Sequence, residues 1–349
     1  MATGNGGAMM ADVTPKVLAP PSVLVVLLNY RTADMTLRAA AAALADMPEG
    51  GELVIIDNAS GDGSAGVLAN AIAQRGWDAQ NRVRLILSDV NGGFGAGNNL
   101  GFKAGMSDGR RPDYFYVLNS DAFPDHGCLP ALIKHLETTP KAGMAGSHVR
   151  GEDDLPHTTA FRFPSIAGEF EGAARTGPFT RLLKSSIVAP DLPQTPTQVD
   201  WVAGASVLMR AAMLDDIGIF DETFFLYFEE TDLCKRAAVA GWECWYLPQV
   251  GVVHIGSVST GMKEWRRIPD YWFASRRHYF VKNHSRAYAA AALLAKLAGG
   301  AIHHLRCKLS GATPQDPPGF NRDLLRFGLG MSLRRDTPLP RRSVSKENP

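Results

Sequence analysis

The first third of the chain alternates between short, almost wholly apolar runs and segments with a helical pattern. The apolar runs cover residues 22–28, 52–56, 83–87 and 114–118. Their length is that of buried β-strands, and the alanine-bearing segments 32–44 and 64–74 between them have the pattern of helices. Strands and helices in alternation predict βαβ units, and hence a mainly parallel sheet with helices on both faces.

This alternation stops at about residue 150, and the rest of the chain predicts a mixed region. Short strands are expected at residues 157–164, 199–209, 243–246 and 250–254. Residues 165–198 carry many Pro, Gly, Ser and Thr residues and are interpreted as a mobile loop. Helices are expected from Glu229 to Ala240 and, with many aromatic and basic residues, from Trp265 to Asn283.

The composition is that of an ordinary globular protein. Among the 349 residues, 45% are apolar and 20% are charged, and the formal net charge of +1 gives no reason to expect a nucleic-acid partner. The four cysteines form no CxxC pair, which argues against a zinc cluster and favours a reducing compartment. The N-terminus has no signal-peptide pattern and no apolar run reaches 18 residues, so we expect a cytoplasmic protein.

Polar side chains follow three of the predicted parallel strands at the point where each strand ends. Asn29 and Arg31 follow the first strand, Asp57 follows the second and Asp121 follows the fourth. Polar residues end strands in many proteins, but the ligands of open parallel sheets bind beyond the carboxyl ends of the strands. Three such positions together therefore predict a ligand site at this edge.

The sequence Asn119-Ser120-Asp121 offers a carboxylate to a divalent cation. Mg²⁺ and Mn²⁺ prefer oxygen ligands and take few of them from protein when diphosphate oxygens fill the other positions. His254, at the end of the predicted strand 250–254, is a second candidate for binding a metal or a phosphate. The structural alternatives are an Asx turn at Asp121 and an ordinary packed histidine at His254.

A glycine-rich segment from Asn91 to Gly101 is expected to form a loop that leads into a helix ending near Ala104. Glycines let backbone amides approach a ligand closely, and a helix N-terminus favours anions. Its GxGxxxG pattern also suggests a dinucleotide site, which gives a first alternative function, an NAD(P)-dependent oxidoreductase. Two strand–helix units precede this segment, whereas the dinucleotide fingerprint normally opens its fold. The segment therefore predicts a nucleotide site of unspecified kind.

Acidic residues gather at the start of the helix predicted from Glu229. Asp232 and Arg236 lie four residues apart and are expected to pair. Glu230 shares a helix face with apolar residues, where burial would raise its pKa and suit it to the role of a general base. The alternative is that these acids only complement the helix dipole.

Seven short motifs follow one another between about residues 22 and 285. They are VVLLNYR (25–31), VIIDNASGDGS (54–64), NGGFGAGNNLG (91–101), YVLNSDAFP (116–124), DWVAGASVLMR (200–210), IGIFDETFFLYFEETDLCKRAAVAGW (217–242) and VVHIGSVS (252–259). In this order they resemble the family 2 glycosyltransferases of the GT-A fold, in the rhamnosyltransferase-like bacterial branch. The resemblance implies an α/β fold with a mainly parallel central sheet flanked by helices and a C-terminal helical extension.

We expect the chain to have five parts. Composition predicts a flexible leader (1–20) and a disordered tail (336–349). Between them, the resemblance implies a nucleotide-sugar-binding half (21–125), an acceptor-binding and catalytic half (126–262) and a C-terminal helical region (263–335).

By the same resemblance, individual residues take on expected roles. Nucleotide-sugar binding is assigned to Asn29, Arg31, Asp57, Asn58, Asn91, Gly93, Phe94, Gly95, Asn98, Asn119 and Asp121. The acceptor and donor-sugar pocket is assigned to Asp200, Trp201, Gly204 and Ala205. Glu230 stands at the position of the catalytic base, where the family often has aspartate, and Glu229 is its rival. Asp121 would hold the cation with His254 nearby, and Arg276 or Arg277 would add positive charge near the diphosphate.

The implied activity is the metal-dependent, inverting transfer of a single sugar, because the QxxRW motif of the processive synthases is absent. The branch suggests a nucleoside-diphosphate sugar donor, first dTDP-L-rhamnose, a glycan or lipid-linked acceptor, and Mg²⁺ or Mn²⁺ as cofactor, in cell-envelope polysaccharide or glycolipid synthesis. The aromatic and basic stretch from Trp265 to Lys308 suits peripheral contact with the inner face of the plasma membrane, although an ordinary packed helix would look similar. A homodimer is left open.

The second alternative function is a non-catalytic nucleotide-sugar-binding protein, because glutamate replaces the usual aspartate base and Asn119 replaces the first acid of the metal motif.

Overall fold

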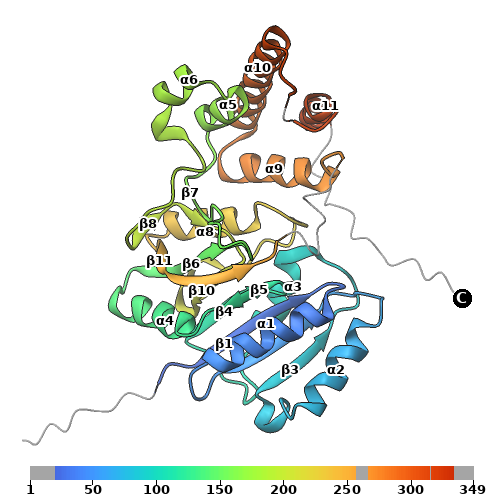
Figure 1. Ribbon diagram of the computed structural model, residues 1–349, viewed down its shortest axis with the longest axis vertical. Helices are drawn as coiled ribbons and strands as arrows, with labels where there is room; N and C mark the ends of the chain where they lie inside the picture. The colour runs from blue at the N-terminus through green and yellow to red at the C-terminus, as the bar shows by residue number, and fades with distance from the viewer. Residues whose placement is uncertain (1–19, 257–265, 315, 334–349) are drawn as a thin grey trace, which may run out of the picture.

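The computed structural model of the protein describes residues 20–256, 266–314 and 316–333. Within these ranges nine strands form one mixed sheet in the order β3-β2-β1-β4-β10-β6-β11-β5, with β8 paired to β11 (Figure 1). The strands are β1 Val23–Asn29, β2 Glu52–Asp57, β3 Val83–Leu87, β4 Tyr114–Asn119, β5 Ala122–Pro124, β6 Ala142–Arg150, β8 Thr197–Val199, β10 Ser206–Arg210 and β11 Glu243–His254. A separate two-stranded ribbon joins β7 (Ala160–Phe161) to β9 (Trp201–Val202).

The parallel part of the sheet is confirmed for the first four predicted strands, since β3, β2, β1 and β4 all run in one direction. Antiparallel β10 then joins β4 to β6, and β11 lies parallel to β6 and antiparallel to β5. Strands from residues 21–125 and from residues 126–262 therefore share one sheet, and the edge at the carboxyl ends of β1, β2 and β4 is formed by both.

Helices cover both faces of this sheet, as the sequence predicts. Alternate side chains of a strand point to opposite faces, so Val25 and Leu27 enter one core while Leu24 and Val26 enter the other. The first core is closed by α1 (Ala33–Asp46), α2 (Ser64–Gln74) and α4 (Cys128–Thr138), and the second by α3 (Gly93–Ala104), α7 (Ala211–Ile217) and α8 (Glu229–Val239). A short 3₁₀ turn, Ala79–Asn81, precedes β3.

The glycine-rich segment is helical from Gly93 onward, which corrects the expected loop through Gly101. Its glycines permit close packing of α3 on β1. A Cβ placed on Gly101 would lie 2.5 Å from Cγ1 of Val26, and one on Gly97 would meet the side chain of Leu28. The helix therefore lies directly on the sheet, which a helix with larger residues at these positions could not do.

This close approach predicts opposite effects for two Gly→Ala substitutions. Gly101→Ala should destabilise the protein by about 1–3 kcal/mol, because the added methyl overpacks the contact with Val26. Gly66→Ala on α2 is the matched control, since a Cβ there meets no atom within 4 Å and should stabilise by about 0.5–1 kcal/mol. Urea unfolding of both variants measures the difference. Equal effects would contradict the packing of α3 on β1.

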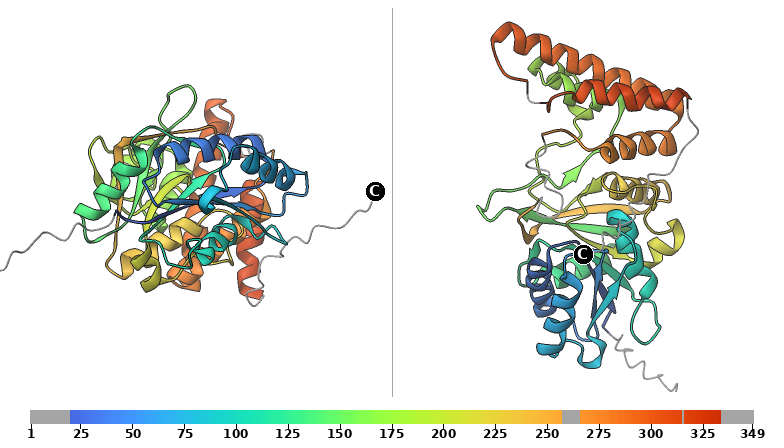
Figure 2. Two further views of the ribbon diagram at one scale, coloured as in Figure 1. Left: turned by 90° about the horizontal axis from the view of Figure 1, so that it is seen from below. Right: turned by 90° about the vertical axis from the view of Figure 1, so that its right-hand side faces the viewer.

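Much of the segment 165–198 is helical, which corrects the mobile loop that the sequence predicts. Residues 166–186 contain α5 (Ile166–Ala174), α6 (Gly177–Leu182) and a 3₁₀ turn, Lys184–Ser186, whereas residues 187–196 have no regular secondary structure. Helix α5 lies beside α10 (Arg286–Ser310) at the end of the molecule farthest from β3 (Figures 1 and 2). A Cβ on Gly299 would lie 2.5 Å from the backbone oxygen of Phe170, so the two helices are nearly in backbone contact. The segment is ordered by a partner far away in the sequence.

A buried ion cluster fastens α5 to the C-terminal helices. Glu169 accepts hydrogen bonds of 3.0 and 2.6 Å from Arg276 of α9 (Asp270–Asn283), and Nζ of Lys296 lies 3.3 Å away. Burial opposes the ionisation of Glu169, but Lys296 and Arg276 outweigh it and lower its pKa. Arg276 is therefore buried in a structural pair, which corrects the expectation that it stands near a diphosphate.

Several predicted boundaries also change. The strand expected at 157–164 shortens to β7, and the region 199–209 is divided between the end of β8, β9 and β10 by a turn at residues 203–205. The two strands expected in 243–254 are one strand, β11, with an irregular register between Leu247 and Gly251.

The C-terminal helical region is confirmed as α9, α10 and α11 (Phe320–Leu333), although α9 begins at Asp270. Trp265, residues 1–19 of the predicted leader and the whole predicted tail, 336–349, lie outside the described residues. Of the helices in the described ranges, none combines the length and the hydropathy that crossing a bilayer requires.

Candidate active site

The carboxyl ends of β1 and β2 meet in a buried hydrogen-bond network. Parallel register places Asn29 beside Asp57, and Nδ2 of Asn29 donates to Oδ1 of Asp57 over 2.7 Å. Ser60 donates to Asp57 twice, from its hydroxyl over 2.6 Å and from its backbone N–H over 3.2 Å. Thr36 donates to Oδ1 of Asn29 over 2.7 Å. Because Asn29 has no exposed surface, it orients Asp57 in this structure and its predicted nucleotide contact is at most indirect.

Arg31 lies at the exposed rim of this network. Its backbone is left-handed, with φ of 58°, and this turns the chain sharply after β1. Its backbone N–H donates to the hydroxyl of Ser60 over 3.0 Å, and Nε donates to the carbonyl of Ser60 over 2.9 Å. The guanidinium also lies 5.1 Å from the ring centre of Tyr30. Arg31 thus holds a positive charge at the loop that follows β2 and Asp57.

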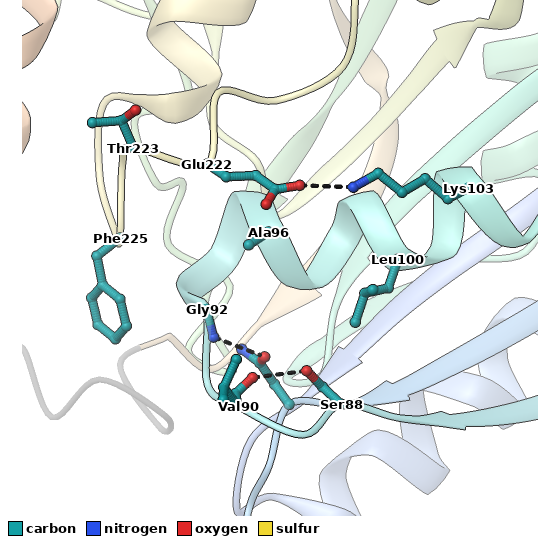
Figure 3. A pocket seen from close by; sticks show the side chains of 10 residues that line it. Ser88, Val90, Gly92, Ala96, Leu100, Lys103, Glu222, Thr223 and Phe225 are labelled. Carbon is teal, nitrogen blue, oxygen red and sulfur yellow. Dashed lines mark hydrogen bonds and ion pairs between the residues drawn. The ribbon is translucent and has the colours of Figure 1, made fainter. Parts of the chain in front are cut away.

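Asn58 ties the end of β2 to the start of α3. Its Nδ2 donates to Oδ1 of Asn91 over 3.0 Å and to the carbonyl of Gly93 over 3.1 Å. The backbone N–H of Gly93 also donates to Oδ1 of Asn91. A cavity of about 150 Å³ lies beside these contacts and is shown in Figure 3. Its lining includes Asn58, Ser88, Gly92, Lys103, Glu222 and Phe225.

Two other predicted residues, Gly95 and Asn98, lie inside the packing of α3. A Cβ on Gly95 would lie 3.1 Å from Cβ of Phe220 and 3.6 Å from Cβ of Glu229. Asn98 is fully buried and donates to the carbonyl of Phe94 over 2.9 Å. Gly95 therefore lies between α3 and the segment that leads into α8, whereas the contact of Asn98 stays within α3.

Asp121 and His254 are brought together, as the sequence predicts. Asp121 follows β4, His254 ends β11, and Nε2 of His254 lies 3.0 Å from Oδ1 of Asp121. Nδ2 of Asn119 lies 3.4 Å from the same histidine nitrogen. In the residues that the structure describes, no group of three or more His, Cys, Asp or Glu side chains is placed to hold a metal ion. A carboxylate and an imidazole nonetheless suit a divalent cation that takes its other ligands from a diphosphate.

Helix α8 begins with two adjacent carboxylates in different surroundings. Glu229 is 2% exposed and packs toward Gly95 of α3. Glu230 faces Gly204, since a Cβ placed on that glycine would lie 4.0 Å from Oε1 of Glu230. In each residue Oε2 is buried and has no hydrogen-bond partner within the described part of the chain. Burial raises the pKa of both side chains, and the neighbouring charge of Glu230 raises that of Glu229 further, well above its ordinary value.

The raised pKa of Glu229 predicts a pH-dependent effect of Glu229→Gln on stability. Below the ordinary glutamate pKa both folded and unfolded chains carry a neutral side chain at this position. As the pH rises above that value, only the unfolded state gains from ionisation, so the wild-type protein loses stability until the folded pKa is passed. Glutamine cannot ionise. The variant should therefore melt higher than wild type at pH 8, with the difference vanishing near pH 4 in thermal scans. A difference in melting temperature that is the same at pH 4 and pH 8 would contradict a raised pKa for Glu229.

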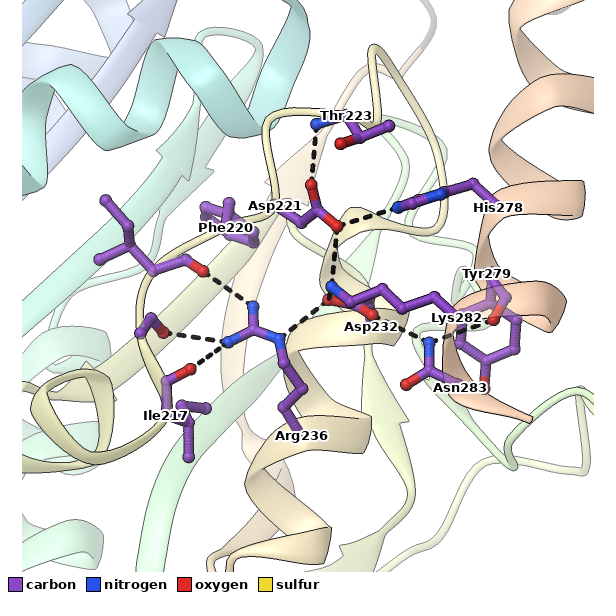
Figure 4. A network of polar contacts seen from close by, with 12 residues as sticks. Ile217, Phe220, Asp221, Thr223, Asp232, Arg236, His278, Tyr279, Lys282 and Asn283 are labelled. Carbon is purple, nitrogen blue, oxygen red and sulfur yellow. Dashed lines mark hydrogen bonds and ion pairs between the residues drawn. The ribbon is translucent and has the colours of Figure 1, made fainter. Parts of the chain in front are cut away.

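A second polar network holds the start of α8 against α9, as Figure 4 shows. Asp232 is fully buried and accepts from Arg236 over 2.9 Å, which confirms the pair predicted from the sequence. Lys282 and Asn283 of α9 also donate to it, over 2.8 and 2.9 Å. Lys282 then bridges to Asp221, over 2.8 Å. The network fixes the helix that carries Glu229 and Glu230.

Asp221 is the far end of this network. Burial acts against its ionisation, but hydrogen bonds from His278 and Lys282 prevail and lower its pKa. Neither Asp221 nor Lys282 is singled out by the sequence, because the residues that they join lie on separate elements and form no motif.

The segment from Asp200 to Ala205 contacts two parts of the site, the start of α8 with Glu230 and the end of β4 with Asn119. Asp200 accepts from the backbone N–H of Phe163 over 2.7 Å, and the Trp201 ring stacks on Phe161 at 4.1 Å. Gly204 faces Glu230, and a Cβ on it would lie 3.0 Å from the ring of Phe94. The carbonyl of Ala205 accepts from the backbone N–H of Asn119 over 3.0 Å. Gly204 and Ala205 thus connect the Glu230 region to the Asp121 region, whereas Asp200 and Trp201 anchor the segment.

Comparison with known proteins adds three likenesses and one family match. The model of the family described as "Glycosyl transferase family 2" matches residues 22–190. The N-acetylglucosaminyl-diphospho-decaprenol L-rhamnosyltransferase of Mycobacterium tuberculosis (strain ATCC 25618 / H37Rv) is 31% identical over 224 residues, covering 60% of this chain and 68% of that protein. Rhamnosyltransferase WbbL of Escherichia coli (strain K12) is 31% identical over 166 residues, covering 46% of this chain and 60% of that protein.

Among solved structures, the mannosyltransferase PcManGT from Pyrobaculum calidifontis, in complex with GDP-Man and Mn²⁺, covers 93% of this chain and 84% of its own. The TM-score is 0.53 and the sequence identity 17%, so this likeness concerns the fold alone.

Proposed function

Because this chain belongs to the family 2 glycosyltransferases, we propose that it transfers L-rhamnose from dTDP-L-rhamnose to a hydroxyl of a lipid-linked glycan, with inversion and with help from Mg²⁺ or Mn²⁺. The activities for which two relatives are named support the sugar, and that of the mycobacterial relative supports the acceptor class. One observation carries the mechanism. Glu230 has a buried oxygen without a partner among the described residues, and it faces Gly204. The next residue, Ala205, accepts a hydrogen bond from Asn119, whose side chain lies 3.4 Å from His254 of the Asp121–His254 pair.

In this proposal the nucleotide lies along the edge formed by Asp57, Arg31 and the start of α3. The Asn29–Ser60 network holds the carboxylate of Asp57 in one orientation as a hydrogen-bond acceptor. Arg31 supplies a fixed positive charge at the rim. The contacts of Asn58 and Asn91 hold the N-terminal end of α3 toward the same edge, where a helix favours a diphosphate.

The cation would be held by Asp121, with His254 beside it. Mg²⁺ at nucleotide sites is usually held by one or two carboxylates, with water and substrate phosphates as its other ligands, and Asp121 would supply such a carboxylate. When bound, the cation neutralises negative charge that builds on the leaving diphosphate. Within the chain itself, the hydrogen bond between His254 and Asp121 fixes the direction of the carboxylate.

Glu230 is the proposed general base. The proton of the acceptor hydroxyl passes to its carboxylate as the hydroxyl oxygen forms a bond to the anomeric carbon. The bond from that carbon to the diphosphate breaks at the same time, and its electron pair leaves with the diphosphate. Attack from the opposite face inverts the anomeric configuration. Burial, which raises the pKa of Glu230, makes its ionised form a stronger proton acceptor than an exposed glutamate.

The reaction would belong to cell-envelope glycan synthesis at the cytoplasmic face of the membrane, where a polyprenyl-linked acceptor presents its sugar. This location is part of the proposal and follows from the acceptor class alone.

The transfer assay that tests the proposal uses dTDP-L-rhamnose, Mn²⁺ and an N-acetylglucosaminyl-diphospho-polyprenol acceptor. NMR of the product should show one added rhamnose whose anomeric configuration is opposite to that of the donor. Retention of configuration would overturn the single-displacement mechanism. Metal-dependent donor binding with no transfer and only slow hydrolysis would favour the binding-protein alternative.

A further inference from the structure

Helix α10 exposes an unbroken apolar stripe to solvent. Seven exposed residues at helical spacing form it, here called the outer stripe: Ala287, Ala290, Leu294, Ala298, Ala301, Leu305 and Leu309. Leu294, Leu305 and Leu309 are 64%, 59% and 81% exposed. At 1.5 Å per residue the stripe is about 33 Å long. A surface helix normally turns its apolar residues toward the core, so this arrangement needs an occupant.

The stripe is not the face by which α10 packs on the protein. That face is a different one, with Ala289, Ala292, Leu293, Gly299, Gly300, His303 and Cys307 buried. It lies against α5, where Gly299 meets the backbone of Phe170, and Gly300 lies close to Asn321 of α11. Since α10 is already docked through its buried face, the outer stripe is an additional apolar surface. The helix that carries it lies at one end of the molecule (Figure 2).

Basic side chains flank the stripe, and α10 contains no Asp or Glu. His304, Arg306 and Lys308 are exposed near its C-terminal half, and Arg286 is exposed at its start. The neighbouring α11 adds exposed Leu325 and Arg326. An apolar stripe with a positive border is the pattern of a helix that lies in the interface of a membrane with anionic lipids.

We propose that the outer stripe of α10 docks this protein on an anionic lipid surface. The leucines enter the boundary between headgroups and acyl chains, and the basic border faces lipid phosphates. The helix lies on the bilayer and does not cross it. The purpose of this docking, bringing the site to a lipid-linked acceptor, rests on the proposed function, but the docking itself does not.

The structure narrows the membrane-contact surface to the α10 part of the stretch, Trp265 to Lys308, that the sequence indicated. The aromatic and basic residues of α9 are used inside the protein, since Trp272 and Phe273 pack against Phe320 of α11 and Arg276 pairs with Glu169. Helix α9 lies between α10 and the sheet in Figure 1 and in the right-hand view of Figure 2. The sheet and its nucleotide edge would therefore project away from the lipid into water.

A second copy of the chain is the competing occupant. In a two-fold dimer the same surface meets itself, so the basic border of one stripe would face the basic border of the other. With no acid on α10 to offset this, self-association through the stripe is electrostatically unfavourable, whereas an anionic bilayer is complementary.

Vesicle flotation of the full chain tests the proposal. Vesicles of phosphatidylcholine with phosphatidylglycerol should float at least tenfold more protein than vesicles of phosphatidylcholine alone. The double variant Leu294→Glu/Leu305→Glu should lose at least tenfold of that binding. Val239→Glu, at a valine of α8 that is 80% exposed and away from the stripe, is the matched control and should float like wild type.

Folding and function are checked separately. The melting temperature of each variant is compared with that of wild type, and a milder pair, Leu294→Ala/Leu305→Ala, replaces the glutamates if they unfold the protein. Calorimetry of dTDP-L-rhamnose binding reports on the proposed function independently of lipid. Wild type that stays in the dense fraction with anionic vesicles, or a double variant that floats normally, overturns the docking proposal. Light scattering that finds a dimer for wild type and a monomer for the double variant also overturns the proposal, because a second copy of the chain would then occupy the stripe.

Discussion

Glu230→Gln is expected to lower kcat at least a hundredfold while dTDP-L-rhamnose still binds. Glutamine keeps the size of the side chain and its contact with Gly204 but cannot accept the proton of the acceptor hydroxyl. General-base catalysis is typically worth about 10²–10⁴-fold in rate. Steady-state kinetics gives kcat, and calorimetry on the same preparation gives the donor Kd, so loss of chemistry is separated from loss of binding.

Glu229→Gln is the matched control for this prediction. Glu229 is next in sequence, equally acidic and more buried, but it packs toward Gly95 and its raised pKa keeps it protonated over a wider pH range. The neutral glutamine should therefore leave kcat within a few-fold of wild type. If the two variants exchanged behaviour, the base would be Glu229. If both retained near-normal turnover, neither carboxylate would be the base.

The pH profile of the wild-type enzyme should carry the same signature. A base acts only when ionised, and burial raises the pKa of Glu230 above the ordinary glutamate value. The rate should therefore fall as the pH drops through that raised pKa. This fall occurs at a higher pH than it would for an exposed carboxylate. The residual activity of Glu230→Gln should lack this acid limb.

Asp121→Asn is expected to weaken donor binding at least tenfold when Mn²⁺ is present. The substitution removes the negative charge that would hold the cation but leaves the volume and the neighbouring His254 in place. Even residues that only support a metal ligand typically cost about 10–100-fold in metal affinity or activity when they are replaced. Calorimetry of the donor with Mn²⁺ measures the effect.

The chelator provides the matched comparison for Asp121→Asn. EDTA should weaken donor binding to wild type by a similar factor and should have little further effect on the variant, because both act through the same cation. Additive losses would mean that Asp121 acts otherwise than through the metal. Wild type that binds donor equally well with and without EDTA would contradict the metal assignment altogether.

The ligand-binding edge of the sheet could be predicted from one rule, that ligands of parallel sheets bind beyond the carboxyl ends of the strands. Residues that follow β1, β2 and β4 must lie together, so Asp57, Arg31 and Asp121 could be named from the apolar runs before them. The pair Asp232–Arg236 was similarly accessible, since helical spacing alone brings the two side chains together. These inferences need only local pattern and strand direction.

The parts that could not be predicted depend on contacts between distant segments. Helix α5 is ordered by α10 and by the pair of Glu169 with Arg276, and its composition alone resembles a loop. The glycine-rich sequence of α3 resembles a loop for the same reason. Its glycines leave room for Val26 and Leu28 of β1, which are distant in the sequence. Asn29 follows a strand like a ligand residue, yet its burial behind Asp57 makes it a support.

The central claim, a sugar-nucleotide site that depends on a divalent cation, is tested most directly by a thermal-shift panel. Nucleoside-diphosphate sugars, including dTDP-L-rhamnose and UDP-linked sugars, are each added with Mn²⁺, Mg²⁺ or EDTA, and with NAD and NADP as the contrasting ligands. A ligand that binds only the folded state raises its melting temperature by mass action. The account predicts a shift with dTDP-L-rhamnose that requires the metal and no shift with NAD or NADP. A shift with NAD or NADP alone, indifferent to EDTA, would contradict it and favour the oxidoreductase.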